Sequence, residues 1–227
     1  MQTLTGVSSM ATRQLLNELS RSFAQAAPWS VEIEAMGGVD AARRVREGTS
    51  FDLVVLAANV MEQLESEGWI VPGTRAGIAR SGVAIAVRRG LPRPAIATES
   101  DVKQAVLAAR KICYSTGPSG DHLKRLFERW NIAGAIAGRV VEAKPGVPVG
   151  ELVARGDADL GFQQLSEFLD VAGIEIVGPL PAEIQTITTF TAGVGAKSAH
   201  ADGARAFIAH CVAPETAATK QRLGMEP

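Results

Sequence analysis

The stretch from residue 3 to residue 23, TLTGVSSMATRQLLNELSRSF, decides the fold class. It begins with strand-forming residues over 3–7. After Ser8 and Ser9 it continues into a helical pattern, with apolar residues at spacings of one, three and four. Because serine is favoured at helix starts, we expect Ser8 or Ser9 to cap this helix. The stretch therefore predicts a strand that leads into a helix.

Two more strand–helix units follow, which makes three in about 68 residues. Residues 31–36 alternate like a strand and lead to a helix that opens at Gly37-Gly38. Residues 51–56 predict a buried strand, and a helix is expected over 59–67. Strands that alternate with helices predict an α/β fold, with parallel sheets covered by helices on both faces.

A second α/β series begins after a break at residues 90–94, which suggests two lobes. We expect residues 1–80 with 193–227 to form the first lobe and residues 81–192 the second. The chain is predicted to cross between the lobes on two strands, within residues 78–88 and 184–194. A single continuous doubly wound sheet is the alternative. Ligands of such sheets bind outside the carboxyl ends of the strands, which between two lobes means the cleft.

The composition excludes several classes of protein. The chain has 227 residues, 46% of them apolar and 21% charged, with a net charge of -1. The balanced charge argues against a nucleic-acid partner, and no apolar run approaches the roughly 20 residues that span a bilayer. The N-terminus shows no secretory leader, so we expect a cytoplasmic protein as written, or a periplasmic one if a leader was removed. Cys113 and Cys211 stand in apolar stretches and are predicted to be buried free thiols.

Four strand-to-helix turns carry glycine or small residues at a helix start: residues 7–10, 36–39, 115–120 and 144–148. A helix start presents unpaired N–H groups and about half a positive charge. Glycine lets a ligand approach the backbone, and serine adds a hydroxyl donor. The turns thus predict a site for a small anion. Its candidate residues are Ser8, Ser9, Gly37, Gly38, Ser115, Gly117 and Ser119. Arg43, Arg44 and Lys144 stand near these turns and are either solvated or able to neutralise a carboxylate.

Two adjacent glutamines, Gln163 and Gln164, follow the predicted strand 158–162. They either aim an amide into the cleft or begin the next helix in solvent. The dinucleotide fingerprint, the phosphate loop and the nucleophile elbow are absent from the sequence. The three histidines lack metal-ligand spacing. We therefore expect neither a cofactor nor a metal.

The runs 7–12, 51–55, 114–120 and 155–161 resemble those of the periplasmic molybdate-binding proteins, which are type II solute-binding proteins of ABC transporters. The resemblance covers essentially the whole chain. It implies a two-lobed periplasmic-binding-protein fold with mainly parallel sheets and two crossover strands. It also implies a tetrahedral oxyanion held by amides and serine hydroxyls, and an ABC transporter permease as partner. By position, the resemblance assigns ligand contacts to Ser8 or Ser9, Gly37 or Gly38, Ser119 and Val147.

The chain departs from the molybdate binders at two places. Gly37-Gly38 replace a turn that carries a serine in that family, and Gln163 or Gln164 stands where the family offers a tyrosine hydroxyl. The run 161–167, GFQQLSE, is similar to aconitate isomerases, which share this fold. That likeness implies a ligand with carboxylates and a reaction.

Three functions are carried forward. The favoured one is a protein that captures a small anion, either an oxyanion such as molybdate or a small organic acid. The second is an isomerase that moves a proton next to a carboxylate, with His122, Glu167, Lys144 and Ser9 as candidate bases. The third is a cytoplasmic effector domain, placed last because the chain lacks a DNA-binding helix-turn-helix. The sequence leaves open whether the chain is an enzyme.

Overall fold

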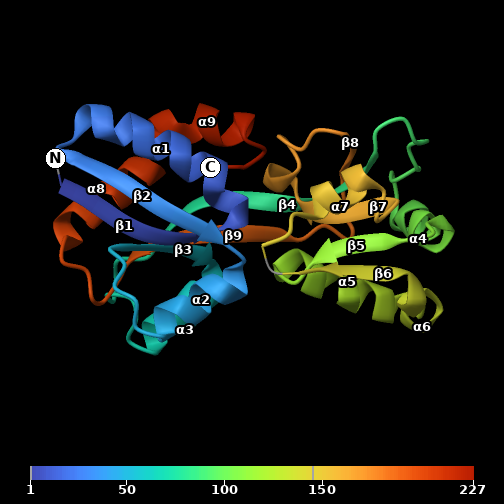
Figure 1. Ribbon diagram of the computed structural model, residues 1–227, viewed down its shortest axis with the longest axis horizontal. Helices are drawn as coiled ribbons and strands as arrows, with labels where there is room; N and C mark the ends of the chain where they lie inside the picture. Colours follow the sequence, from blue (N-terminus) through green and yellow to red (C-terminus); the bar gives the residue numbers. More distant parts are fainter. Residues whose placement is uncertain (1, 145) are drawn as a thin grey trace. The chain divides into compact units, whose positions relative to one another are not determined.

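The computed structural model describes residues 2–144 and 146–227. The chain folds into two compact units, Met1–Ser81 with Thr188–Pro227 (unit 1) and Gly82–Ile187 (unit 2). It leaves unit 1 within β4 (Ala76–Arg88) and returns at the start of β9 (Ile187–Val194). Both units combine helices with β-strands (Figure 1).

The sheet of unit 1 is built on β1 (Gln2–Ser9). It pairs in parallel with β2 (Trp29–Met36) and β3 (Leu53–Ala57), and β3 pairs antiparallel with β9. Ser9 lies opposite Met36, and Ser8 lies opposite both Ala35 and Val55. Because the three parallel strands share this register, their carboxyl ends meet at one edge of the sheet.

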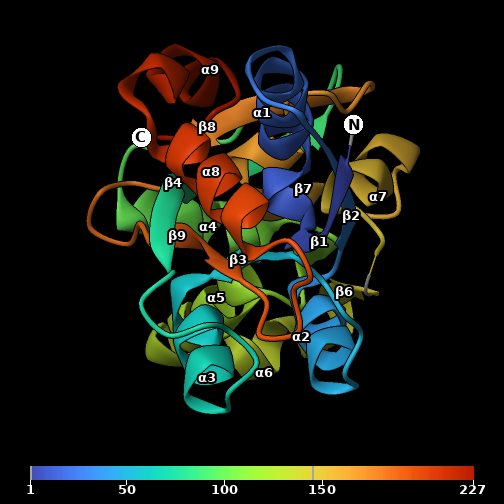
Figure 2. The same cartoon turned by 90° about the vertical axis from the view of Figure 1, so that its left-hand side faces the viewer.

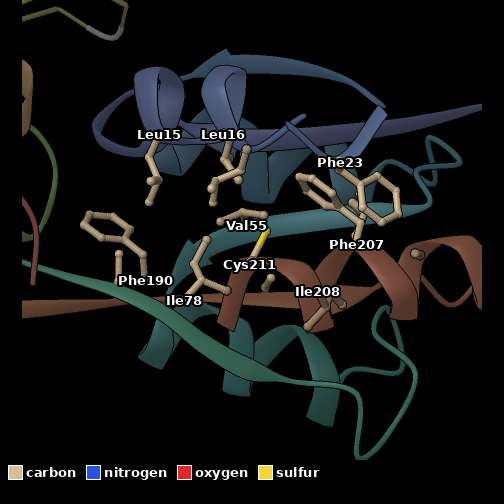
Figure 3. Packing of buried hydrophobic residues seen from close by; sticks show 14 of the residues in the cluster. Leu15, Leu16, Phe23, Val55, Ile78, Phe190, Phe207, Ile208 and Cys211 are labelled. Carbon is tan, nitrogen blue, oxygen red and sulfur yellow. The ribbon is translucent and has the colours of Figure 1, made fainter. Parts of the chain in front are cut away.

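Helices cover both faces of this sheet, as Figures 1 and 2 show. On one face lie α1 (Arg13–Ala26), α8 (Ala201–Val212) and α9 (Ala217–Arg222), and on the other α2 (Gly38–Arg46) and α3 (Ala58–Ser66). The apolar stripe of α1 is buried as the periodicity predicts (Figure 3). The rings of Phe23 on α1 and Phe207 on α8 meet edge to face, with their centroids 5.3 Å apart.

The sheet of unit 2 has the same parallel arrangement around β5 (Ile112–Ser115). This strand lies between β6 (Val140–Ala143) and β7 (Leu160–Gln164). Here β4 pairs antiparallel with β7 and with β8 (Ile174–Pro179). The expectation of mainly parallel sheets with two crossover strands is confirmed, and the crossing strand β4 pairs antiparallel with its neighbours in this unit.

Two layers of helices also enclose the sheet of unit 2. One layer contains α4 (Glu99–Ala108), α5 (Pro118–Arg129) and α6 (Ala133–Ile136), and the other contains α7 (Val149–Arg155). Four short 3₁₀ turns complete the described elements: η1 (Met10–Thr12), η2 (Ala137–Arg139), η3 (Leu165–Glu167) and η4 (Pro214–Thr216).

Both cysteines are buried and free, as the sequence predicts. Among the helices of the described residues, none is long and apolar enough to cross a membrane.

Candidate functional site

The carboxyl edge of the unit 1 sheet carries a buried hydroxyl without a partner. Ser9 ends β1 and is 8% exposed. Its Oγ is the one fully buried side-chain oxygen or nitrogen without a hydrogen-bond partner in the part of the chain that the structure describes. The Ser9 carbonyl, by contrast, accepts bonds from Ser8 Oγ at 3.3 Å and Thr12 Oγ1 at 3.1 Å. A buried hydroxyl in this state is a donor available to a ligand.

The prediction that Ser8 or Ser9 caps the first helix is wrong. Ser8 and Ser9 both remain in β1, because their pairing with β2 extends to Met36. Ser9 precedes the short turn η1, and α1 begins only at Arg13, after Thr12. Neither Ser9 nor Thr12 makes a side-chain capping bond.

The helix start at Gly37-Gly38 presents backbone N–H groups at the same edge. The first bond of α2 runs from the Ala41 N–H to the Gly37 carbonyl at 2.9 Å. The amides of residues 38–40 precede it, so they have no partner within the helix. A Cβ placed on Gly38 would meet no atom within 4 Å, and the next side chain, Val39, is 64% exposed. The start of α2 therefore has open space beside Gly38, and the Val39 side chain that follows is apolar.

The start of α3 lies at this edge too, although it was not among the predicted turns. Its first residue follows Ala57, which has no side chain able to cap. Alanine offers neither a hydroxyl nor the backbone freedom of glycine, so the residue types at this helix start did not indicate a binding site. The position of the helix directly after a buried parallel strand could have indicated it.

In unit 2 the predicted turn 115–120 is tightly built. The hydroxyls of Ser115 and Ser119 lie 3.1 Å apart, and Ser119 is 2% exposed. The N-terminus of α5 follows Gly117 without a side-chain cap. A Cβ on Gly120 would lie 1.7 Å from the Ser115 carbonyl oxygen, so only glycine lets the helix approach the strand this closely. The turn holds two hydroxyls beside uncapped amides.

The predicted turn 144–148 is described except at Pro145, which lies outside the described residues. The Val147 N–H donates to the Lys144 carbonyl at 2.9 Å, so its amide is used within the turn. The Lys144 side chain is exposed.

Both glutamines belong to β7 itself and do not begin a helix in solvent. Gln163 is 3% exposed and Gln164 is 4% exposed. Gln163 Oε1 accepts a bond from the Val149 N–H, the first amide of α7, at 3.0 Å. Gln163 Nε2 donates to Glu167 Oε2 at 2.6 Å. Both ends of the Gln163 amide are therefore engaged inside the protein.

The charged groups near these turns pair mostly with one another. Arg43 bonds Asp40 at 2.7 Å, and Arg44 pairs with Glu34. The candidate base His122 is half-buried, and its Nε2 lies 2.7 Å from the Ile184 carbonyl oxygen. Burial lowers the pKa of His122, more than the Ile184 carbonyl raises it. The described residues contain no cluster of three or more His, Cys, Asp or Glu side chains that could hold a metal.

The structure thus gathers the candidate residues into one set per unit. Unit 1 brings together Ser8, Ser9, Gly37 and Gly38, and unit 2 brings together Ser115, Gly117, Ser119, Gln163 and Gln164. Uncapped amides and hydroxyls without full positive charge suit a small anion, because helix dipoles stabilise negative charge without a counter-ion.

Comparisons with known proteins bear on this arrangement. Residues 4–226 match the model of a family described as bacterial extracellular solute-binding protein. An aconitate isomerase from a Pseudomonas species is 32% identical over 231 aligned positions, which cover 99% of this chain and 88% of that protein. The resemblance to aconitate isomerases therefore extends far beyond residues 161–167.

Solved structures share the fold. The periplasmic molybdate-binding protein of Azotobacter vinelandii has a TM-score of 0.82 at 21% identity, with 99% of each chain covered. The sulfate-binding protein SubI of Mycobacterium tuberculosis H37Rv has a TM-score of 0.78 at 16% identity, covering 100% of this chain and 87% of that one. The predicted periplasmic-binding-protein fold is confirmed. Since the family model spans nearly the whole sequence, this chain belongs to the bacterial extracellular solute-binding proteins.

Proposed function

We propose that this protein captures a small organic acid with more than one carboxylate, using hydroxyls and backbone amides at the carboxyl ends of its parallel strands. The observation that carries the proposal is the Ser9 hydroxyl, which is buried and without a partner among the described residues. An unpaired buried hydroxyl costs roughly 1–3 kcal/mol, and a ligand oxygen that accepts its hydrogen bond would remove that cost.

Three features favour an organic acid over a tetrahedral oxyanion. The start of α2 offers two glycines in place of hydroxyl donors, and the space beside Gly38 is open. The exposed Val39 side chain can contact the carbon skeleton of an organic acid, which an oxyanion lacks. The relative at 32% identity is named for aconitate, a tricarboxylate. The runner-up ligand is an oxyanion such as molybdate or sulfate.

Calorimetric titration tests the proposal directly. The protein would be titrated with citrate, cis-aconitate, trans-aconitate, molybdate and sulfate at one pH and ionic strength. We expect a tricarboxylate to bind at least tenfold more tightly than either oxyanion. Tighter binding of molybdate or sulfate would make the runner-up correct, and the absence of binding by all five at millimolar concentration would refute an anion site.

A second candidate function is an isomerase that acts on an unsaturated tricarboxylate. The 32% identity to aconitate isomerase over nearly the whole chain supports it. The carboxylate of Glu167, at the carboxyl end of β7, supports it as well, because proton transfer next to a carboxylate needs a base and donors that stabilise the resulting charge. Purified protein incubated with cis- or trans-aconitate and followed by NMR separates the two functions. Unchanged spectra alongside measurable binding would leave the binding protein alone.

The family supports an inference about the partner and the location. We infer that the chain acts outside the cytoplasmic membrane and delivers its ligand to an ABC transporter permease, which is the usual arrangement for solute-binding proteins. The extracellular description of the family supports this location. A pull-down from membranes with and without ligand would test it, since a ligand-dependent permease partner is expected.

A further inference from the structure

Two hydrogen bonds fix the orientation of a carboxylate at the carboxyl end of β7. The Val149 N–H can bond only the oxygen end of the Gln163 amide, which it does at 3.0 Å. The NH₂ end must then face Glu167, where it donates to Oε2 at 2.6 Å. Because Gln163 is 3% exposed, solvent does not compete for either bond. The start of α7 therefore orients Glu167 through a single buried amide.

Donors for an anionic ligand lie on the strand next to Gln163, within unit 2. Tyr114 pairs with Phe162, so Ser115 and Gln163 are the next residues along these two parallel strands. Ser115 in turn contacts the Ser119 hydroxyl in the first turn of α5. Glu167 ends η3, and its hydrogen-bond partner Gln163 therefore neighbours the strand that leads to the hydroxyls and uncapped amides of the α5 start. An enolate needs this combination, with a base at the carbon and donors at the developing charge.

The other candidate bases fit the role less well. His122 already uses Nε2 on the Ile184 carbonyl. The Lys144 side chain is exposed. Ser9 has no hydrogen-bond partner among the described residues that could take its proton. Glu167 alone among the four candidates is an oxygen acid oriented by a buried neighbour.

We infer that Glu167 is the catalytic residue that moves the proton in an unsaturated tricarboxylate, and that Gln163 is its positioning residue. This inference rests on the second candidate function above. The Glu167 carboxylate takes a proton from the methylene next to the double bond. The electron pair of that C–H bond forms the new double bond, and the pair of the old one binds the returning proton at the far carbon. One C–H bond breaks and one forms, so no cofactor is needed.

Deuterium exchange reads out the first step even without net isomerisation. With trans-aconitate in D₂O, we expect the wild-type protein to replace carbon-bound hydrogen on the substrate, seen as loss of the proton NMR signals. Glu167→Gln should slow this loss at least 10²-fold, the usual contribution of a positioned base. Calorimetric Kd values should stay within threefold, because the amide keeps the shape of the side chain. Glu151→Gln removes an exposed acid from the first turn of α7 and should exchange like wild type.

Variants at Gln163 separate positioning from helix capping. Gln163→Leu loses both bonds. Gln163→Glu keeps an oxygen for the Val149 N–H, but it places a second carboxyl group against Glu167, so the pair shares a proton and Glu167 is a weaker base. We expect both variants to exchange at least tenfold more slowly than wild type, with little change in Kd. If Gln163 serves only to cap α7, Gln163→Glu will exchange at the wild-type rate, and the positioning role fails.

Further outcomes distinguish the inference from the proposed function. Wild-type protein that binds trans-aconitate but exchanges no hydrogen overturns the inference and leaves a binding protein. Full exchange by Glu167→Gln also overturns it. Wild-type protein that binds none of the tricarboxylates contradicts the proposed function itself.

Discussion

The buried hydroxyl of Ser9 lowers the stability of the unliganded protein and is expected to strengthen ligand binding. Replacing Ser9 with alanine removes the buried unpaired oxygen. We expect the free energy of unfolding without ligand to stay the same or rise by about 1 kcal/mol. We expect Kd for the best tricarboxylate to rise about tenfold, as the loss of one hydrogen bond to a charged group implies. Urea denaturation and calorimetry measure the two effects.

The matched control for Ser9 is Ser66→Ala. Ser66 is an exposed serine at the end of α3, and its hydroxyl donates to the Gln63 carbonyl of its own helix. This variant should change neither quantity. A Ser9→Ala variant that binds as tightly as wild type would remove Ser9 from the site.

Asp52 makes the stability of unit 1 sensitive to acid. Its two carboxylate oxygens accept bonds from the Thr5 N–H at 2.9 Å and Ser198 Oγ at 2.7 Å, and from the His200 N–H. Burial alone would raise the pKa of Asp52, but these hydrogen bonds and the nearby His200 outweigh it and lower the pKa below its ordinary value. Asp52 is 5% exposed, so water does not replace these bonds.

The direction of the pH effect follows from that lowered pKa. A carboxylate whose pKa is lower in the folded state contributes stability above the unfolded pKa of about 3.9 and loses it as pH falls through the folded value. We expect Asp52→Asn to lower the free energy of unfolding by about 2 kcal/mol at pH 7. Both oxygens of Asp52 accept hydrogen bonds, so the NH₂ group of an asparagine would face a donor and leave it unpaired. The difference from wild type should shrink below pH 4. Urea denaturation at pH 7 and pH 3 checks this, and a difference that does not depend on pH would contradict it.

The contact between α5 and β5 depends on one glycine. An alanine at Gly120 would place its Cβ 1.7 Å from the Ser115 carbonyl oxygen, so the helix start must move. We expect Gly120→Ala to cost about 2–3 kcal/mol of stability and to weaken ligand binding, because Ser119 moves with it. Gly134→Ala on α6 is the control, since its Cβ would meet no atom within 4 Å. Thermal unfolding should show loss for the first variant only.

Helices and strands could be predicted from the sequence where a pattern within the element itself determines it. The spacing of Leu15, Leu16, Leu19 and Phe23 predicted α1, because burial of a single stripe holds that helix. The cap at Ser8 or Ser9 and the end of strand 158–162 were misplaced, because pairing with neighbouring strands extends β1 to Ser9 and β7 to Gln164. Strand pairing is a contact between distant segments, and local patterns do not contain it.

The candidate site was predictable by residue type but not by role. Helix starts rich in glycine and serine indicated where uncapped amides would gather, and the structure places them at the carboxyl edges of the two sheets. That Gln163 bonds the Val149 N–H and Glu167, and does not point freely outward, depends on how α7 packs on β7. Such side-chain pairings arise only once tertiary packing is fixed.

At the scale of the whole molecule, ligand binding should appear as thermal stabilisation. A ligand at 100 times its Kd adds about 2.7 kcal/mol to the folded state, which for a chain of this size raises Tm by about 5–10 °C. The transition of unit 1, which contains Ser9, should move to higher temperature when the ligand is present. Scanning calorimetry measures this shift, and an unchanged Tm at this ligand concentration would contradict binding.

The two thiols have a practical consequence for labelling. Cys113 and Cys211 are fully buried, and burial is the main cause that raises the pKa of each to about 12. Because only the thiolate reacts readily, maleimide dyes should leave both unmodified while the protein is folded. A single cysteine introduced on an exposed surface would therefore take up one fluorophore without prior removal of the natural pair. The wild-type background is thus ready for fluorescence measurements.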